Sequence, residues 1–223
     1  MISVIMSIRN NENTLEKCLN SIINQTFKDF EFLIIDDFST DGSLKILKKF
    51  EKKDSRIKVF QNNINLGLTK SLNHLINKSK GEYIARQDGD DVSLQSRFKD
   101  QFYYLESGEY DFCVTRAKTI QSKIIIPRIT YYLPQKSVRK FKNPFIHGTL
   151  MIRKKTLLDI GGYDESFYYA QDYKLFYDLL ENDIKFKYLK KPLYRLNIAD
   201  NISSLHKVEQ KYYASCVKSN KKP

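Results

Sequence analysis

Short apolar runs recur along the first half of the chain. In the segments between these runs, apolar residues recur at the spacing of one helix face. The runs cover residues 2–8, 30–35, 57–60 and 83–85, so their starts lie 28, 27 and 26 residues apart. Apolar runs of this length are typical of buried strands. Their spacing is close to the length of a strand–helix–strand unit. The pattern therefore predicts four strands with a helix between each consecutive pair.

The segments between these runs carry apolar residues on one helical face. This spacing is found within residues 15–23, 44–50 and 68–76. Strands that alternate with helices form a mainly parallel central sheet with helices on both faces. The sequence therefore predicts an α/β fold of the doubly wound, Rossmann-like kind.

The second half is less regular, because Pro127 and Pro134 interrupt it and exclude long elements around them. We expect helices over residues 97–106, 154–160 and 172–181, and strands over residues 112–120 and 148–152. Residues 203–217 carry a further helical pattern. One domain is predicted over residues 1–204, followed by a basic, helical C-terminal tail over residues 205–223.

Positive charge is concentrated in the middle of the chain. The sequence has 38 Lys and Arg against 26 Asp and Glu, which gives a formal net charge of +12. Residues 112–158 hold 11 of the basic residues and no acidic one, so the remainder is nearly balanced. Such an asymmetry suggests contact with a polyanion or a membrane surface. A general bias towards lysine explains the excess equally well, and both interpretations stay open.

The composition argues against several protein classes. No apolar stretch approaches the roughly 18–20 residues that a membrane-spanning helix needs. Residues 1–9 lack the basic start and the small-residue cleavage site of a secretory signal. Cys18, Cys113 and Cys216 are far apart and form no CxxC pair, which argues against a disulfide scaffold and a cysteine zinc site. We expect a cytoplasmic protein.

Polar residues follow three of the predicted strands. Residues 9–13, Asp36 with Asp37, and residues 86–91 all come directly after an apolar run. In a doubly wound sheet, ligands bind beyond the carboxyl ends of the strands. Because these ends are neighbours, we expect the three clusters to converge on one site.

The cluster after the fourth strand concentrates negative charge. Asp88, Asp90 and Asp91 place three carboxylates within four residues, and Gly89 allows the turn to bend. Carboxylates this close repel one another unless a positive group lies between them. Mg²⁺ or Mn²⁺ is a suitable partner, with water and substrate phosphates as its remaining ligands. The alternative is a solvated turn that caps the next helix.

Three familiar ligand-binding loops do not occur in the sequence. Asp37, Ser39 and Asp41 imitate the start of an EF-hand loop, but Lys48 stands where that loop requires glutamate. There is neither a GxxxxGKS or GxxxxGKT phosphate loop nor a GxGxxG dinucleotide turn. A P-loop kinase and an NAD-dependent enzyme therefore lose their main support.

Seven motifs occur in a fixed order over residues 1–204. They are ISVIMSIRNNENTLEKCLNSIINQTF, FEFLIIDDFSTDGS, NLGLTKSLNHLI, GEYIARQDGDDVSLQSRF, NPFIHGTLMIRK, GGYDESFYYAQDYKLFYDLL and LYRLNIADNIS. With them, the chain closely resembles family 2 glycosyltransferases, which are inverting enzymes of bacterial surface-polysaccharide synthesis with the A-type fold of nucleotide-diphospho-sugar transferases. The resemblance implies a nucleotide-sugar-binding half over residues 1–111 and an acceptor and catalytic-base half over residues 112–204.

The resemblance also implies roles for the residues that match the family's motifs. Asp172 would be the catalytic base, and Asp37 would hydrogen-bond the nucleotide base, most often uracil. Asp90 and Asp91 would reach a divalent cation, Mn²⁺ or Mg²⁺, that bridges the two phosphates. The other positions implied to border the nucleotide-sugar are Ile8, Asn10, Glu12, Arg86, Asp88 and Gly89, together with Asp37 and Asp90. From the residues alone, Asp37 is equally well explained as a capping acid, and Asp172 is better explained as one.

Three further residues are candidates for contact with the acceptor or with phosphate. His147 is either such a contact or a core histidine, and Arg195 either pairs with a diphosphate or lies in a surface ion pair. Gln171 stands where the family usually has Glu, directly before the implied base. A second departure from the family pattern is Asn197, where the family often has His.

The function implied by the resemblance is transfer of one sugar from a UDP-sugar, or another nucleotide-sugar, to a hydroxyl of a glycan or a lipid-diphosphate-linked acceptor. The basic stretch and tail would contact an anionic membrane at the cytoplasmic face of the inner membrane. One rival is a non-catalytic basic domain that binds nucleic acid, but the sequence lacks an aromatic RNA-reading signature. The other is a sugar nucleotidyltransferase, which usually has a Gly-rich basic loop after its first strand. We expect no nucleic-acid partner.

Overall fold

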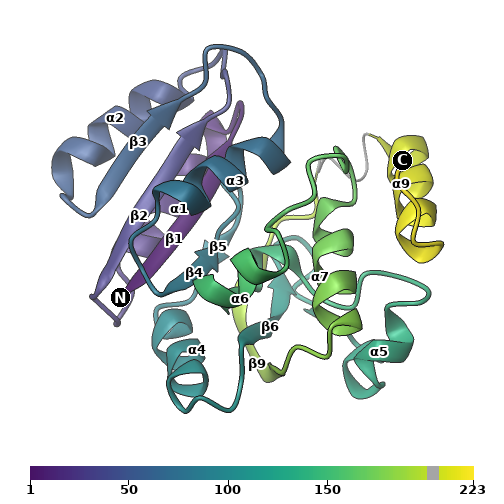
Figure 1. Cartoon of the computed structure of the whole chain (residues 1–223). Helices are drawn as coiled ribbons and strands as arrows, with labels where there is room; N and C mark the ends of the chain where they lie inside the picture. Colours follow the sequence, from purple (N-terminus) through teal and green to yellow (C-terminus); the bar gives the residue numbers. More distant parts are fainter. Residues whose placement is uncertain (200–205) are drawn as a thin grey trace.

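The computed structural model describes residues 1–199 and 206–223 and contains all four strands predicted for the first half. They are β1 (Ile2–Ile8), β2 (Phe30–Asp36), β3 (Ile57–Gln61) and β4 (Tyr83–Arg86). The connecting helices are α1 (Glu12–Ile23), α2 (Ser43–Lys53) and α3 (Leu68–Lys78). The strands pair in parallel in the order β3-β2-β1-β4 (Figure 1), which confirms the α/β prediction.

The register of these strands aligns their carboxyl ends. Ile8 at the end of β1 lies opposite Asp36 at the end of β2. On the other side of β1, Ile5 lies opposite Arg86, the last residue of β4. The loops that follow β1, β2 and β4 therefore leave the sheet at one edge, where ligands of such sheets bind.

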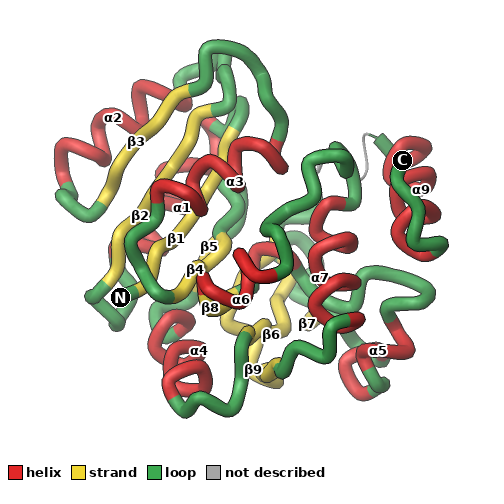
Figure 2. The backbone as a smooth tube through the Cα atoms, in the orientation of Figure 1, coloured by secondary structure: helices red, strands yellow, loops and turns green. Residues whose placement is uncertain are grey.

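The second half extends the sheet with further strands (Figure 2). These strands run in both directions. β8 (Met151–Arg153) runs antiparallel to β4, and β6 (Phe112–Thr119) runs antiparallel to β8. β9 (Phe186–Leu196) lies parallel to β6, and two short strands, β5 (Val92–Ser93) and β7 (Ile125–Ile126), pair with β9 and β6. The sheet is therefore parallel through its first four strands and mixed beyond them.

β9 has no counterpart among the elements predicted from the sequence. Lys190 and Lys191 interrupt the apolar alternation, and Pro192 has no N–H to donate to a neighbouring strand. The pairing with β6 is irregular at this point, because Thr115 lies opposite Leu189 whereas the next residue lies opposite Pro192. A strand with this composition is specified by its neighbours rather than by its own pattern.

Helices cover both faces of the sheet, as the alternation of strands and helices predicted. On one face, α1, α2 and α4 (Arg97–Glu106) pack against Val4 and Met6 of β1. On the other, α3, α6 (Lys154–Asp159) and α7 (Gln171–Glu181) pack in the cluster that contains Ile5. Successive residues of a strand point to opposite faces, so β1 contributes to both layers.

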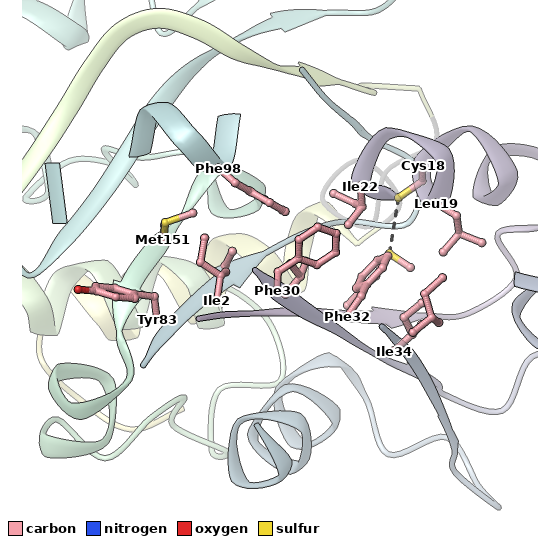
Figure 3. Packing of buried hydrophobic residues seen from close by; sticks show 14 of the residues in the cluster. Ile2, Cys18, Leu19, Ile22, Phe30, Phe32, Ile34, Tyr83, Phe98 and Met151 are labelled. Atoms are coloured by element: carbon pink, nitrogen blue, oxygen red, sulfur yellow. Dashed lines mark hydrogen bonds between the residues drawn. The ribbon is translucent and has the colours of Figure 1, made fainter. Parts of the chain in front are cut away.

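The core beneath α1 shows how the first layer is built. Figure 3 shows Cys18, Leu19 and Ile22 of α1 above Phe32 and Ile34 of β2. All five side chains are fully buried. At about 25 cal/mol per Å² of apolar surface removed from water, this packing is the main force that holds α1 against the sheet.

The segment predicted as a strand over residues 148–152 is only partly one. A short 3-10 helix, η2 (His147–Thr149), comes first, and β8 begins at Met151. Oγ1 of Thr149 donates to the carbonyl of Ile146 at 2.8 Å, which favours a turn over an extended strand. The basic stretch before it contains the short elements η1 (Thr130–Tyr132) and α5 (Gln135–Val138), in keeping with its prolines.

The tail forms α9 (Lys207–Lys218), which lies against α7 (Figure 1). Cys216 and Val217 pack with Phe167 and Tyr173 in a small cluster of their own. The expected start of this helix at residue 203 and the end of the domain at residue 204 lie outside the described residues. Within residues 1–199 and 206–223, the structure contains no helix with the length and apolar character to cross a membrane.

Phe112 tests the packing of the second layer. Its ring is fully buried and lies 5.3 Å from the ring centroid of Phe186 and 5.7 Å from that of Phe145. We expect Phe112→Ala to lower the free energy of unfolding by about 3–5 kcal/mol. Phe141→Ala, at a side chain that is 74% exposed, should change it by less than about 0.5 kcal/mol. Urea denaturation of the two variants measures both, and equal losses would contradict the assigned packing.

Candidate active site

Side chains after β1 fasten the loops at the carboxyl edge of the sheet. Asn10 has a left-handed backbone with φ 55°, and its Oδ1 accepts the N–H of Thr40 at 2.8 Å. Glu12 begins α1, and its Oε2 accepts the N–H of Gly42 at 2.9 Å. Both partners lie between β2 and α2. Asn10 and Glu12 are themselves exposed, so they both shape this edge and border the solvent there.

Asp37 is turned inward rather than toward the open edge, and it is 3% exposed. Its Oδ1 accepts hydrogen bonds from Nδ2 of Asn62 at 2.7 Å and from the N–H of Leu66 at 2.8 Å. Its Oδ2 accepts the N–H of Gly67 at 2.8 Å. Asp37 therefore organises the loop before α3. Among the described residues, its Oδ2 accepts a single hydrogen bond and keeps a lone pair, so the contact with a nucleotide base stays a prediction.

The turn after β4 packs closely under the end of β1. A methyl group on the Cα of Gly89 would lie 2.6 Å from Cγ2 of Ile8, so only glycine fits here without a shift. Oγ1 of Thr14 donates to the carbonyl of Gly89, and Sγ of Cys18 donates to the carbonyl of Asp88, both at 3.2 Å. These contacts bring the polar clusters after β1 and β4 together.

Arg86 and Asp88 form an ion pair at the centre of the site. Nη2 of Arg86 lies 2.5 Å from Oδ1 of Asp88. The Arg86 side chain is 1% exposed and that of Asp88 is 28% exposed, so the carboxylate is the member that reaches the open edge. Nε of Arg86 is buried and has no hydrogen-bond partner among the described residues. A buried donor without an acceptor is costly, and an anionic ligand oxygen would satisfy it.

Asp90 and Asp91 share one partner, Asn197, which follows β9. Nδ2 of Asn197 donates to Oδ2 of Asp90 at 3.2 Å, and its N–H donates to Oδ1 of Asp91 at 2.6 Å. Burial raises the pKa of Asp90, and the neighbouring Asp88 raises it further. Burial also raises the pKa of Asp91 well above its usual range, with Asp88 and Asp90 adding to the effect. Asp91 is 1% exposed, whereas Asp90 keeps partial exposure.

These carboxylates fit a divalent cation that takes most of its ligands from elsewhere. In the described part of the chain, no group of three or more His, Cys, Asp or Glu side chains is placed to hold a metal ion. Mg²⁺ and Mn²⁺ commonly bind through one or two carboxylates and complete their shell with water and phosphate oxygens. Asp90, whose charge is opposed by burial and by Asp88, fits such a cation. Asp91 is buried and accepts a backbone N–H, and its metal contact stays a prediction.

Arg97 of α4 supports this turn from below, and the sequence did not single it out. It is fully buried, yet no carboxylate pairs with it among the described residues. Its guanidinium donates to the carbonyl of Arg86 at 2.7 Å, to Oγ of Ser93 at 2.8 Å and to Oε1 of Gln87 and Gln101 at 3.1 and 3.0 Å. Burial lowers the pKa of Arg97 to about 10, so it remains charged at neutral pH. A cation is thus fixed beneath the aspartates.

Tyr194 of β9 joins the buried arginine to the acidic turn. Its hydroxyl accepts the N–H of Asp88 at 3.2 Å, and the guanidinium of Arg97 lies 5.0 Å from the centre of its ring. Gly148 lies directly beside this pair, because a methyl group on its Cα would lie 2.7 Å from Oδ2 of Asp88. The corner around Asp88 is therefore closely packed on three sides.

Asp172 lies in the first turn of α7 in a desolvated position. Its Oδ2 accepts Nδ2 of Asn143 at 2.7 Å, and its Oδ1 accepts the N–H of Tyr173 at 2.8 Å. Burial raises the pKa of Asp172 to about 6, the Tyr173 and Asn143 hydrogen bonds oppose the rise, and the charge of Asp88 adds to it. The carboxylate is ionised at neutral pH but accepts a proton more readily than an exposed aspartate.

His147 is a buried neutral side chain. Its Nε2 lies 2.6 Å from the hydroxyl of Tyr163, and burial with the nearby Arg86 lowers the pKa of His147 to about 3. Burial also raises the pKa of Tyr163, whose surroundings include Arg86, Asp88 and Asp172. The pair lies between the acidic turn and the aspartate of α7, and His147 is bonded within the protein like a core histidine.

α3 is fastened to the loop that leads into α7. Oγ1 of Thr69 donates to the carbonyl of Phe167 at 2.9 Å. Asn73 exchanges two hydrogen bonds with the backbone of Tyr163, at 2.8 and 3.0 Å. At the start of α3, Gly67 has φ 84°, and a methyl group there would lie 2.6 Å from a ring carbon of Tyr168. The loop organised by Asp37 is thus joined through α3 to the segment that carries Asp172.

Two candidates from the sequence are less well placed. Arg195 is exposed and follows the buried Tyr194, so its side chain points to the opposite face of β9, away from Asp88. Its predicted diphosphate contact therefore finds no geometric support. Gln171 is the first residue of α7 and is partly exposed, beside Asp172.

Comparison with known proteins places this geometry in a family. A family model described as glycosyl transferase family 2 matches residues 3–161. The putative glycosyltransferase EpsE of Bacillus subtilis is 38% identical over 165 residues, which cover 73% of this chain and 59% of that protein. The O-antigen biosynthesis glycosyltransferase WbnJ of Escherichia coli is 33% identical over 184 residues, which cover 81% of this chain and 72% of that protein.

Solved structures share the fold at lower identity. Residues 1–349 of TarS from S. aureus, in complex with UDP-GlcNAc, align with a TM-score of 0.77 and 24% identity over 90% of this chain and 59% of that one. The mannosyltransferase PcManGT of Pyrobaculum calidifontis, in complex with GDP-Man and Mn²⁺, aligns with a TM-score of 0.76 and 14% identity over 100% of this chain and 65% of that one. At these identities, the two comparisons show that the proteins share a fold.

These matches identify the family, whereas the roles of the individual residues stay predictions. The family match takes in the acidic turn, and it leaves no support for a nucleic-acid-binding domain or a sugar nucleotidyltransferase. The chain belongs to glycosyl transferase family 2 and has the A-type glycosyltransferase fold.

Proposed function

We propose that this chain is an inverting, metal-dependent glycosyltransferase that moves one sugar from a UDP-sugar to a hydroxyl of a glycan or lipid-linked acceptor. One observation carries the proposal. An acidic turn suited to a cation lies close enough to the desolvated Asp172 that the charge of Asp88 raises the pKa of both Asp90 and Asp172. On one side of the reacting carbon, the donor diphosphate needs a cation. On the other side, the acceptor hydroxyl needs a group that takes its proton.

The donor half would bind the nucleotide-sugar at the carboxyl edge of the sheet. Ile8, Asn10 and Glu12 border this edge, and Asp88 would lie against the ribose and diphosphate. Arg86 would sit beside the phosphates, since it carries a buried N–H without an acceptor. A divalent cation held by Asp90 would offset the negative charge that develops on the leaving diphosphate. Asp37 would act on the base through the loop that it organises.

The base step follows from the position of Asp172. Its carboxylate takes the proton of the acceptor hydroxyl while that oxygen forms a bond to the anomeric carbon. The bond from that carbon to the diphosphate oxygen breaks on the opposite side, so a single displacement inverts the anomeric centre. A base with a pKa of about 6 is ionised at neutral pH and is a stronger proton acceptor than an ordinary aspartate.

Asn143 is the residue that would hold the base in place. Its side-chain Nδ2 donates a hydrogen bond to Oδ2 of Asp172, and its own Oδ1 accepts the N–H of Phe145 at 3.2 Å. The other base oxygen, Oδ1, already accepts the N–H of Tyr173 from its own helix. With both oxygens oriented, the remaining lone pairs face a fixed direction, which is the requirement for a base that must meet the acceptor in line.

The relatives indicate the kind of pathway. Their names include O-antigen biosynthesis and poly(ribitol-phosphate) β-glucosyltransferase, and TarS is seen with UDP-GlcNAc. We therefore propose bacterial polysaccharide or glycoconjugate synthesis. The three cysteines are free and buried, which supports a reducing compartment, and we propose the cytoplasm.

Donor binding and transfer test the proposed function separately. UDP with Mn²⁺ at about a hundred times its dissociation constant should stabilise the fold by about 2.7 kcal/mol, measured as a rise in melting temperature. Asp90→Asn should reduce this rise, whereas Asp172→Asn should keep it. In assays with UDP-, GDP- and dTDP-sugars, Asp172→Asn should lose transfer by about 10²-fold or more. Transfer that survives in Asp172→Asn would refute the base assignment.

Asn143→Ala tests the positioning of the base through a pH profile. The Asn143 hydrogen bond lowers the pKa of Asp172, so its removal should move the acidic limb of kcat to higher pH. Asn143→Asp places a second carboxylate there and should move the limb further in the same direction. A purely structural loss would reduce kcat without moving the limb. As a control, Asn20→Ala on the exposed side of α1 should leave the profile unchanged.

The raised pKa also predicts that ionised Asp172 lowers the free energy of unfolding. A carboxyl with a folded-state pKa above its unfolded value stabilises the fold when protonated, and this contribution is lost as pH rises from about 4 to about 6. At pH 8, Asp172→Asn should therefore be more stable than the wild type by about 1–3 kcal/mol, and the difference should shrink toward pH 4. Urea denaturation at both pH values measures this. Glu109→Gln, at an exposed carboxylate, should show no such pH-dependent gain.

A further inference from the structure

The segment over residues 121–142 exposes both basic and apolar side chains, and this set of exposed side chains is here called the basic apolar face. Its exposed cations are Lys123, Arg128, Lys140 and Lys142, none of which forms an ion pair among the described residues. Its large exposed apolar side chains are Ile124, Ile129, Tyr132, Leu133 and Phe141. Both kinds of side chain alternate along one short stretch of chain.

A groove is lined by residues of this face between 123 and 133 together with Arg116 of β6. It has a volume of about 770 Å³. Ile125, Ile129 and Leu133 supply apolar walls, and Arg116, Lys123 and Arg128 bring positive charge to the same groove. The groove thus combines the two features that an amphiphilic anion requires: an apolar floor and a cationic rim.

The apolar side chains here are exposed to an unusual degree. Ile129 is 77% exposed, Tyr132 is 69% exposed and Phe141 is 74% exposed. Several large apolar side chains gathered on one surface mark an interaction site more often than a free surface. Lys and Arg beside them keep their charge in water while their stems lie along apolar surface. This is the composition of segments that lie in a lipid headgroup region.

We propose that the basic apolar face docks the protein onto an anionic lipid bilayer. The charge is complementary, since residues 112–158 contain no acidic side chain. Among the described residues, Asp183 and Glu181 are the acidic residues that form ion pairs with the segment, through Lys136 and Arg139. Each basic residue near an anionic bilayer strengthens binding by about fivefold. The docking does not depend on the proposed transfer reaction.

The ends of the face lie at the two halves of the active site. At one end, Nε2 of Gln121 donates to Oδ1 of Asn197, which in turn bonds Asp90. At the other end, Lys142 is followed by Asn143, which bonds Asp172. A bilayer held by residues 121–142 would therefore lie beside both the donor corner and the base. In Figure 1, α5 and α9 lie at the end of the molecule opposite α2.

A lipid surface fits these residues better than the other partners that a basic surface suggests. A nucleic acid would bind the cations through its phosphates and stack its bases on Tyr132 or Phe141, but it would leave the apolar Ile129 and Leu133 without a partner. A second copy of this chain would bury the apolar residues, but it would bring the same unbalanced cations face to face. An anionic bilayer satisfies both sets at once.

Vesicle flotation of the full chain tests the proposal. We expect binding to phosphatidylcholine vesicles that contain about 30% phosphatidylglycerol, little binding to phosphatidylcholine alone, and release at about 0.5 M salt. Tyr132→Ser and the triple variant K123E/R128E/K140E should each lower the bound fraction at least fivefold. Matched controls are Tyr103→Ser, at a tyrosine that is 72% exposed on α4, and K45E/K52E/K53E on α2, and both should float like the wild type.

Several outcomes would overturn the docking proposal. Equal binding to neutral and anionic vesicles, or no binding to either, refutes it. Equal losses in K123E/R128E/K140E and K45E/K52E/K53E would show that net charge rather than this face is responsible. Sedimentation that reveals a Tyr132-dependent dimer would assign the face to self-association instead. Asp172→Asn should float like the wild type, so loss of transfer and loss of docking are distinguished.

Discussion

The repulsion among three carboxylates in the turn after β4 is the constraint on which the site depends. Asp88, Asp90 and Asp91 are held within four residues, and burial opposes the ionisation of the last two. Such a turn is stable only when positive charge and donors surround it. The chain supplies Arg86 at its side, Arg97 beneath it and Asn197 across it. Each comes from a different element, so the sheet, α4 and the end of β9 must all be in place before the turn can form.

This requirement explains why the second half of the sheet is irregular. β9 carries both Tyr194, which bonds the backbone of Asp88, and the residue that leads to Asn197. The break in its pairing with β6 near Pro192 precedes these residues by only a few positions. The pairing of β6 with β9 is thus irregular close to the site. Strand irregularities in proteins are often found beside functional sites.

The sequence predicted the parts of the fold that follow a simple period. The four parallel strands, α4 and the extent of α7 were evident because each buries its own apolar face. β9 was missed because its lysines and proline hide the strand pattern. A strand was predicted from residue 148, although η2 ends at Thr149 and β8 begins at Met151. In the site, residue types and motifs pointed to Asp88, Asp90 and Asp172, and also to Arg86 and Asn197, but they did not point to the contacts of Arg97 and Asn143. Arg97 and Asn143 stand within motifs that were noticed, yet their contacts join residues that are far apart in the chain.

The attachment of α3 to the loop before α7 has a consequence for how the two regions of the site move. Thr69 and Asn73 fix the backbone around Tyr163 and Phe167, while the start of α3 is fixed by Asp37. α3 therefore connects the loop organised by Asp37 to the segment that carries Asp172. A displacement of that loop would be passed along the helix to the segment that leads into α7, so the two regions are mechanically coupled.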